Sequence, residues 1–137
     1  MSIKANKVLA CQFFHELLNS PNLESVSAMI DASYVDHAAP PGLAAGPDGF
    51  RQLVRMFRQA FPDMLATVED VIAEGDRVVL RWTARGTHQG DLMGFAPTGR
   101  EVMMTGINIY RIASGRIVER RGNSDDFGMW QQLGMFS

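Results

Sequence analysis

The chain has 137 residues, of which 46% are hydrophobic and 20% are charged, and its formal net charge is −2. These values predict a single globular domain over residues 1–137 and exclude a disordered chain. A slightly acidic balance without a basic stripe excludes nucleic acid as the expected partner. No apolar run approaches the ~20 residues of a membrane span, and no signal-peptide core is visible. The chain has a single cysteine, Cys11, and therefore no intramolecular disulfide. Together these features lead us to expect a soluble cytoplasmic protein.

Helical spacing of apolar side chains dominates the chain up to Pro62. The expected helices cover residues 6–19, 23–30 and 46–61. The Ser-Pro pair at residues 20–21 predicts the end of the first helix, because a residue before proline disfavours helical dihedral angles. Asn22 is a suitable N-cap for the second helix, and Pro47 suits the first turn of the third.

From residue 65 onward the apolar pattern alternates, which predicts β-strands. The expected strands cover residues 65–73, 77–88, 101–113 and 116–123. Tight turns join the first pair and the last pair, and a loop over residues 89–100 separates the two pairs. A short closing helix over residues 127–133 ends at Gly134. Helices first and antiparallel strands afterwards predict an α+β fold, with three helices on one face of a curved sheet enclosing a cavity.

Two adjacent aspartates, Asp125 and Asp126, lie where the last expected strand gives way to the last helix. One interpretation is a helix N-cap, because aspartate is preferred there and its charge complements the helix dipole. The other is a general base, since a carboxylate in an apolar cavity can have its pKa raised toward the working pH. Both interpretations can hold together, with Asp126 capping the helix and Asp125 pointing into the cavity.

Other candidate site residues are distributed along the chain. His88, at the end of a strand, and His37 are each interpreted either as a turn histidine bonded to the backbone or as a donor to a substrate oxygen. Trp82 and Met93 either fill the core or line a pocket for a bulky planar ligand. Asn108, on the third expected strand, is a further candidate for substrate binding.

Motifs for several other chemistries are absent from the sequence. It contains no HExxH motif and no paired cysteines, so we expect no metal site. It contains no Gly-x-Ser-x-Gly elbow, which argues against a serine hydrolase triad. It contains no Walker loop and no GxGxxG motif, so we expect no nucleotide cofactor.

Four stretches carry a resemblance to a known family. They are NKVLACQFFHELLNSPNLESVSAMI, YVDHAAPPG, the segment beginning at Phe61 that includes GTHQGDLMGFAPTG, and IVERRGNSDDFGMWQQLG. Their order resembles the SnoaL-like polyketide cyclases, a branch of the nuclear transport factor 2-like superfamily. The resemblance implies a cone-shaped barrel made of a strongly curved antiparallel sheet, three N-terminal helices and a short C-terminal helix, enclosing a pocket. It also implies a homodimer that needs no cofactor or metal.

The same resemblance implies a function. It points to a cyclase or isomerase that closes a ring by intramolecular aldol condensation on a small apolar or aromatic carbonyl compound, with an acidic residue as base. Two alternatives are a dimeric pocket protein that binds an apolar metabolite without turnover, and a small hydrolase that activates water in the same pocket. An inward carboxylate beside a hydrogen-bond donor would favour chemistry over binding alone.

Matched residue by residue, the family's acidic base falls on Asp125, with Asp126 as the alternative one residue on. Trp82 and His88 match pocket positions of the family. The chain departs from the family at Arg120-Arg121, where members often carry His-Trp or Glu-Trp. Strand alternation would put Arg121 on the same face as Asp125. Arg121 could then lower the pKa of that carboxylate or bind a carboxylate of the substrate.

Overall fold

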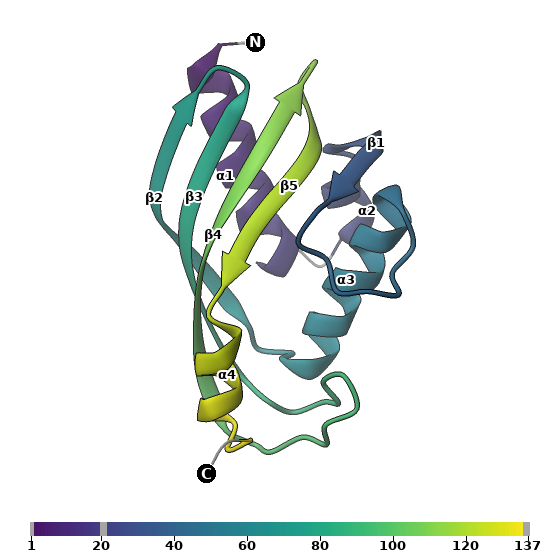
Figure 1. The fold of residues 1–137 in the computed structure, drawn as a ribbon, viewed down its shortest axis with the longest axis vertical. Helices are drawn as coiled ribbons and strands as arrows, with labels where there is room; N and C mark the ends of the chain where they lie inside the picture. Colours follow the sequence, from purple (N-terminus) through teal and green to yellow (C-terminus); the bar gives the residue numbers. More distant parts are fainter. Residues whose placement is uncertain (1, 20–21, 136–137) are drawn as a thin grey trace.

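The computed structural model describes residues 2–19 and 22–135, which form four helices and one five-stranded sheet (Figure 1). In chain order the elements are α1 (Ile3–Asn19), α2 (Leu23–Ser27), β1 (Ile30–Asp36), α3 (Gly46–Ala60), β2 (Leu65–Glu74), β3 (Arg77–Thr87), β4 (Glu101–Ala113), β5 (Arg116–Ser124) and α4 (Asp126–Gln132). The predicted helix end at residues 20–21 lies outside the described residues. Within the described ranges, no helix combines the length and the apolar character needed to cross a bilayer.

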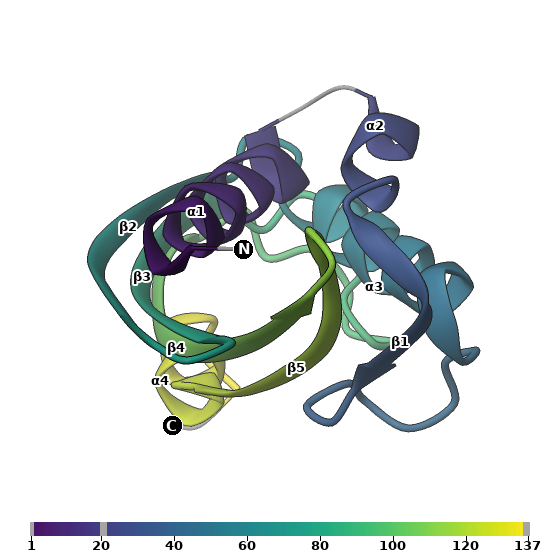
Figure 2. The ribbon, with the colours of Figure 1, turned by 90° about the horizontal axis from the view of Figure 1, so that it is seen from above.

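The sheet has the strand order β1-β5-β4-β3-β2. Strands β2, β3, β4 and β5 pair antiparallel with one another in this order, which confirms the predicted α+β arrangement of helices before antiparallel strands. The sheet is not closed, and it curves into an open cone. Figure 2 shows strands β2 to β5 forming an arc, with α1 across its inner side and α3 beside β1.

Strand β1 was not predicted from the sequence, which instead extended the second helix to residue 30. In the structure α2 ends at Ser27, and β1 pairs parallel with β5 through Asp36 and Arg120. Only Ile30 and Tyr34 are buried in β1, and a spacing of four residues is typical of a helix rather than a strand. The hydrogen-bonded pairing with β5, far along the chain, therefore makes this segment a strand rather than part of a helix.

The inner face of the sheet carries the core. Buried residues alternate along the two central strands, as the sequence predicted for residues 77–88, because successive side chains of a strand point to opposite faces. They are Val78, Leu80 and Ala84 on β3, and Val102, Met104, Tyr110 and Ile112 on β4. From α1, Phe13 meets Tyr110 edge to face, with 5.6 Å between the ring centroids. This contact fixes how α1 lies across the sheet.

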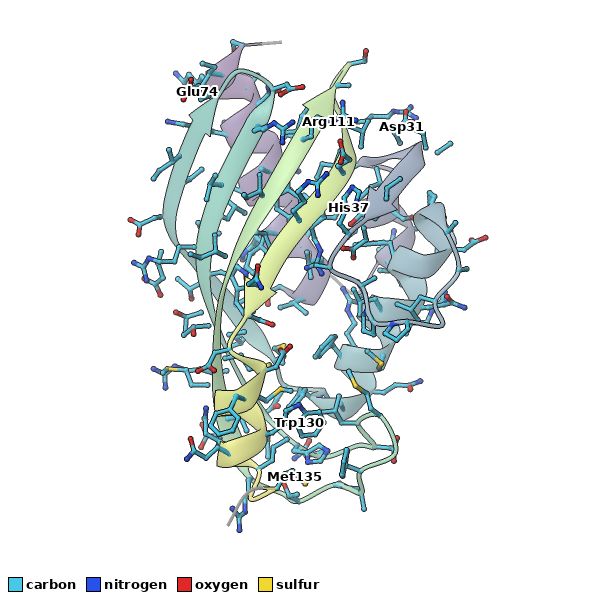
Figure 3. All side chains as sticks on the ribbon, viewed as in Figure 1. Asp31, His37, Glu74, Arg111, Trp130 and Met135 are labelled. Atoms are coloured by element: carbon cyan, nitrogen blue, oxygen red, sulfur yellow. The ribbon has the colours of Figure 1, made fainter. Side chains whose placement is uncertain are left out.

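A group of charges on the outer face ties β1 to the rest of the sheet. Glu119 on β5 accepts hydrogen bonds from Arg111 on β4 and from His37, whose Nε2 lies 2.7 Å from Oε2. Arg121 approaches the same carboxylate at 3.5 Å. Figure 3 shows His37 and Arg111 close to β5. Because His37 directly follows β1, this network helps to hold the parallel edge strand in register.

The network predicts a pH-dependent stability. Hydrogen bonds from Arg111 and His37 lower the pKa of Glu119 from its ordinary value of 4.5 to about 2. The ionised carboxylate thus stabilises the fold fully above pH 4.5, and the contribution is lost as the pH falls toward 2. We expect Glu119→Gln to lower the melting temperature at neutral pH and the gap to wild type to narrow on acidification, as followed by circular dichroism.

The matched control is Glu69→Gln, because Glu69 is an exposed glutamate of β2 without an ion pair in the described part of the chain. We expect this variant to melt close to wild type at every pH. A gap between Glu119→Gln and wild type that stays constant on acidification would contradict the assigned role of Glu119.

Candidate functional site

A cavity of about 360 Å³ lies between the inner face of the sheet and the helices α1, α3 and α4. Its walls are mainly apolar side chains from these helices and from β3 and β4. The apolar lining consists of Phe13, Phe14, Leu17, Leu18, Ala38, Pro40, Phe50, Leu53, Val54, Phe57, Met64, Ala84, Met93, Met104 and Met129. Such a pocket is large enough for a small organic molecule.

The structure separates the predicted site residues into two groups. Those on the cavity wall are Trp82, Met93, Asn108 and Asp126. Those that are not among its lining residues are Asp125, His88, His37 and Arg121. Five polar lining residues were not proposed from the sequence as site residues, namely Tyr34, Asp36, Tyr110, Arg120 and Ser124.

The two aspartates are arranged in the reverse of the expected way. Asp125 is the N-cap of α4, and its Oδ1 accepts a hydrogen bond of 2.9 Å from the backbone N–H of Gly128. Asp126 lies on the cavity wall together with Ser124, whose hydroxyl donates to Asp126 Oδ1 at 2.7 Å. Within the described residues Asp126 has no cationic partner.

The orientation of strand β5, that is, which of its residues face the cavity, accounts for part of this difference from the prediction. The sequence predicted that Glu119, Arg121, Asn123 and Asp125 share a face. The first three do so along β5, on the outer face, whereas Asp125 lies beyond the strand as the N-cap of α4. Arg121 is exposed on the outer face beside Glu119, whereas Arg120 and Ser124 line the cavity. Because side chains alternate along a strand, a shift of one residue exchanges the inner and outer sets. Pairing of Tyr110 with Arg120 and of Gly106 with Ser124 fixes the phase.

Polar side chains gather at one end of the cavity around Arg120. Its Nε donates to Asp36 Oδ1 at 3.0 Å, and Asn108 Nδ2 donates to the Tyr110 hydroxyl at 3.0 Å. Burial raises the pKa of Tyr110 to about 12, and burial also raises the pKa of Tyr34. Both phenols consequently keep their protons at neutral pH. The i, i+2 spacing of Asn108 and Tyr110 on one strand was the available sequence signal for this cluster.

Trp82 lies at the other end of the cavity, near Ser124. A Cβ atom at Gly106 would lie 2.4 Å from Trp82 Cζ2, so this glycine leaves the space that the indole occupies. Gly106 is also the sheet partner of Ser124. The indole Nε1 is buried and has no hydrogen-bond partner among the described residues. An orphaned donor of this kind can be satisfied by an oxygen atom of a bound molecule.

The two predicted histidines have other partners. His88 is fully buried, and its Nδ1 accepts a hydrogen bond of 3.2 Å from the backbone N–H of Thr98. This contact closes the loop between β3 and β4 on itself. His37 binds Glu119 on the outer face. Neither side chain lines the cavity, because His88 is directed into the base of the loop and His37 toward β5.

The loop between β3 and β4 reaches the cavity through Met93. The next aromatic residue, Phe95, packs against Trp130 of α4 with 5.0 Å between the ring centroids. Figure 3 shows Trp130 between α4 and this loop. No group of three or more His, Cys, Asp or Glu residues that could hold a metal ion occurs in residues 2–19 and 22–135.

Comparisons with known proteins agree with this geometry. A family model described as SnoaL-like polyketide cyclase matches residues 8–133. The aklanonic acid methyl ester cyclase of Streptomyces peucetius is 31% identical, over 87% of this chain and 84% of its own. IdmH of Streptomyces antibioticus, a candidate polyketide cyclase, superposes with a TM-score of 0.80 at 37% identity, over 94% of this chain and 98% of its own. TsrD of Streptomyces laurentii shares the fold, with a TM-score of 0.89 at 24% identity over 99% of both chains.

The capping role of Asp125 can be tested by stability. We expect Asp125→Ala to lower the free energy of unfolding by about 1 kcal/mol, because the N–H of Gly128 loses its acceptor. Asp125→Asn should leave stability nearly unchanged, since asparagine caps helices as well as aspartate does. Urea denaturation of both variants measures the difference. Equal midpoints for Asp125→Ala and wild type would show that the cap contributes nothing.

Proposed function

This chain belongs to the SnoaL-like polyketide cyclase family, and we propose that it closes a ring in a small polyketide by intramolecular aldol condensation, with Asp126 as the general base. The cyclases among its curated relatives support a cyclase-type enzyme. One observation carries the choice of base. Asp126 lies on the wall of a largely apolar cavity, accepts a hydrogen bond from Ser124 and has no cationic partner in the described ranges.

The proposed reaction begins with proton removal. A carboxylate oxygen of Asp126 takes a proton from the carbon next to a substrate carbonyl, and the C–H electron pair moves to the carbonyl oxygen as an enolate. The enolate carbon attacks a second carbonyl of the same molecule, which forms the new C–C bond and leaves an alkoxide. Asp126 returns its proton to that alkoxide. Atoms and charge balance without a cofactor.

Other groups of the cavity support this step. The unpaired N–H of Trp82 can donate to the developing enolate oxygen, where charge accumulates in the transition state. The Ser124 hydroxyl orients the carboxylate of Asp126 by donating to Oδ1. Apolar walls from α1 and α3 hold the two reacting carbons of one molecule together, which removes much of the entropic barrier to ring closure.

The base can be tested with a matched pair of variants. We expect Asp126→Asn to lower kcat/KM by about 10²- to 10⁴-fold, the usual contribution of a positioned general base. Asp125→Asn should stay close to wild type, because the amide keeps the helix cap. Turnover of aklanonic acid and of its methyl ester, followed by chromatography of the products, measures both effects.

The outcomes separate the candidate roles. Loss of activity only in Asp125→Asn would move the base to the neighbouring residue. Full activity in both variants would contradict the carboxylate mechanism. Binding of these compounds by the wild-type protein without any product would favour a pocket protein that does not catalyse the reaction.

We further propose that two copies of the chain associate through the outer face of the sheet. Large apolar residues are exposed there, among them Leu65 at 69%, Ile72 at 65% and Ile107 at 47%. Water contact with such a group is unfavourable, and a second copy with the same face can cover it.

We expect light scattering at micromolar concentration to give about twice the chain mass of 15.2 kDa. The variant Ile107→Lys should dissociate the dimer, because it places a charge in the interface. Val8→Lys should not, since Val8 is an exposed residue of α1 away from that face. A wild-type mass equal to that of one chain would contradict the proposal.

A further inference from the structure

We infer, on the basis of the proposed function, that the substrate of this enzyme carries an ionised carboxylate, which Arg120 binds at the end of the cavity remote from Asp126. The relative from Streptomyces peucetius reported above is named for a methyl ester, so this inference assigns a different substrate class to this chain. It follows from three features of the cavity, namely the free edge of Arg120, an excess of hydrogen-bond donors around it, and its distance from Asp126.

The first feature is the way in which Arg120 is held. Its Nε donates to Asp36 Oδ1 at 3.0 Å, and the same oxygen accepts the backbone N–H of Ala38 at 3.0 Å. The side chain is only 22% exposed and lines the cavity. Its two terminal nitrogens form no hydrogen bond with any residue in the described ranges. Asp36 thus fixes one edge of the guanidinium and leaves the other available to a ligand.

The second feature is the excess of donors next to this free edge. The Tyr110 hydroxyl accepts a hydrogen bond from Asn108, so its own proton has no acceptor in the described chain. The Tyr34 hydroxyl also lines the cavity without a hydrogen-bond partner among described residues. Both phenols stay protonated because burial raises their pKa values. Asp36 Oδ2 and Asn108 Oδ1 are acceptors at the same end that accept no hydrogen bond from the described residues. The donors outnumber them, so the complementary ligand group consists mainly of acceptors.

A carboxylate satisfies these donors better than an ester. Its two equivalent oxygens match two parallel N–H groups of a guanidinium, and the charge strengthens each hydrogen bond. An ester presents one good acceptor and replaces the other by an alkoxy group, which leaves a buried donor unpaired. The positive charge of Arg120 is retained here, since nearby Tyr110, Asp36 and Tyr34 outweigh the desolvation that acts to lower its pKa.

The third feature is the length of the cavity. Arg120 and Ser124 lie on the same face of β5 and are four residues apart, which corresponds to roughly 13 Å along a strand. Asp126 lies two residues after Ser124 and accepts a hydrogen bond from its hydroxyl. A substrate that reaches both ends is elongated, and its carboxylate is separated from the acidic C–H by the length of two or three fused rings. Arg120 would therefore position the substrate without touching the reacting carbons.

The inference can be tested by binding alone, with a pair of unreactive probes. We choose anthraquinone-2-carboxylate and its methyl ester, measured by quenching of tryptophan fluorescence, since Trp82 and Trp130 line the cavity. We expect wild type to bind the acid at least about tenfold more tightly than the ester. Arg120→Gln should remove this preference, and Arg120→Lys should retain part of it, because lysine keeps the charge without the two parallel donors.

Arg121→Gln is the matched control, because Arg121 is the adjacent arginine on the outer face, and it should keep the wild-type preference for the acid. Circular dichroism checks that each variant is folded. If Arg120→Gln does not fold, the comparison of wild type with Arg120→Lys decides the question. Equal binding of both probes by wild type, no binding of either, or an unchanged preference in a folded Arg120 variant would overturn the inference.

These readouts are separate from catalysis. Asp126→Asn should preserve the preference for the acid while it loses turnover. If wild type prefers the acid but Asp126→Asn keeps full activity, the carboxylate site is supported and the proposed base is wrong. If Asp126→Asn loses activity while Asp125→Asn does not, and wild type shows no preference for the acid, the proposed base is supported and the carboxylate site is wrong.

Discussion

The ion pair between Asp36 and Arg120 is the contact on which the cavity depends. It joins the parallel edge strand β1 to β5 at the last residue of β1, and α3 packs against β1. Without β1 in register, α3 would lose its support and one wall of the cavity would be displaced. Because both charges are largely buried, removal of either partner would leave the other unpaired at a cost of about 3–5 kcal/mol.

The same pair gives the cavity two chemically different ends. Around Arg120 most of the groups without a hydrogen-bond partner in the described ranges are donors, supplied by the guanidinium and by the hydroxyls of Tyr34 and Tyr110. At the other end Asp126 supplies an acceptor beside the unpaired N–H of Trp82. Apolar side chains separate the two ends, and the end near Arg120 is the more buried one, because Asn108 and Tyr110 are buried whereas Ser124 and Asp126 are exposed. For the elongated substrate proposed above, this polarity would impose one orientation.

Several side chains that look catalytic in the sequence serve the framework. His88 closes the β3–β4 loop through Thr98, His37 and Arg121 meet Glu119 on the outer face, and Asp125 caps α4. Each of these side chains lies outside the cavity lining and stabilises a helix, strand or loop next to the cavity. Their arrangement shows how polar residues near a site can act through position rather than through contact with substrate.

The sequence by itself determined the order of helices and strands, the alternation along β3 and β4, and the place of Trp82, Met93, Asn108 and one aspartate of the pair at the cavity. These features follow from local periodicity, which a single strand or helix expresses in its own residues. Strand β1 and the inward phase of β5 were decided only by tertiary structure. Strand β1 depends on hydrogen bonds with a segment more than 80 residues away, Asp36 with Arg120 among them. The phase of β5 depends on its pairing with β4, and a shift of one residue would have turned Arg121 inward instead of Arg120.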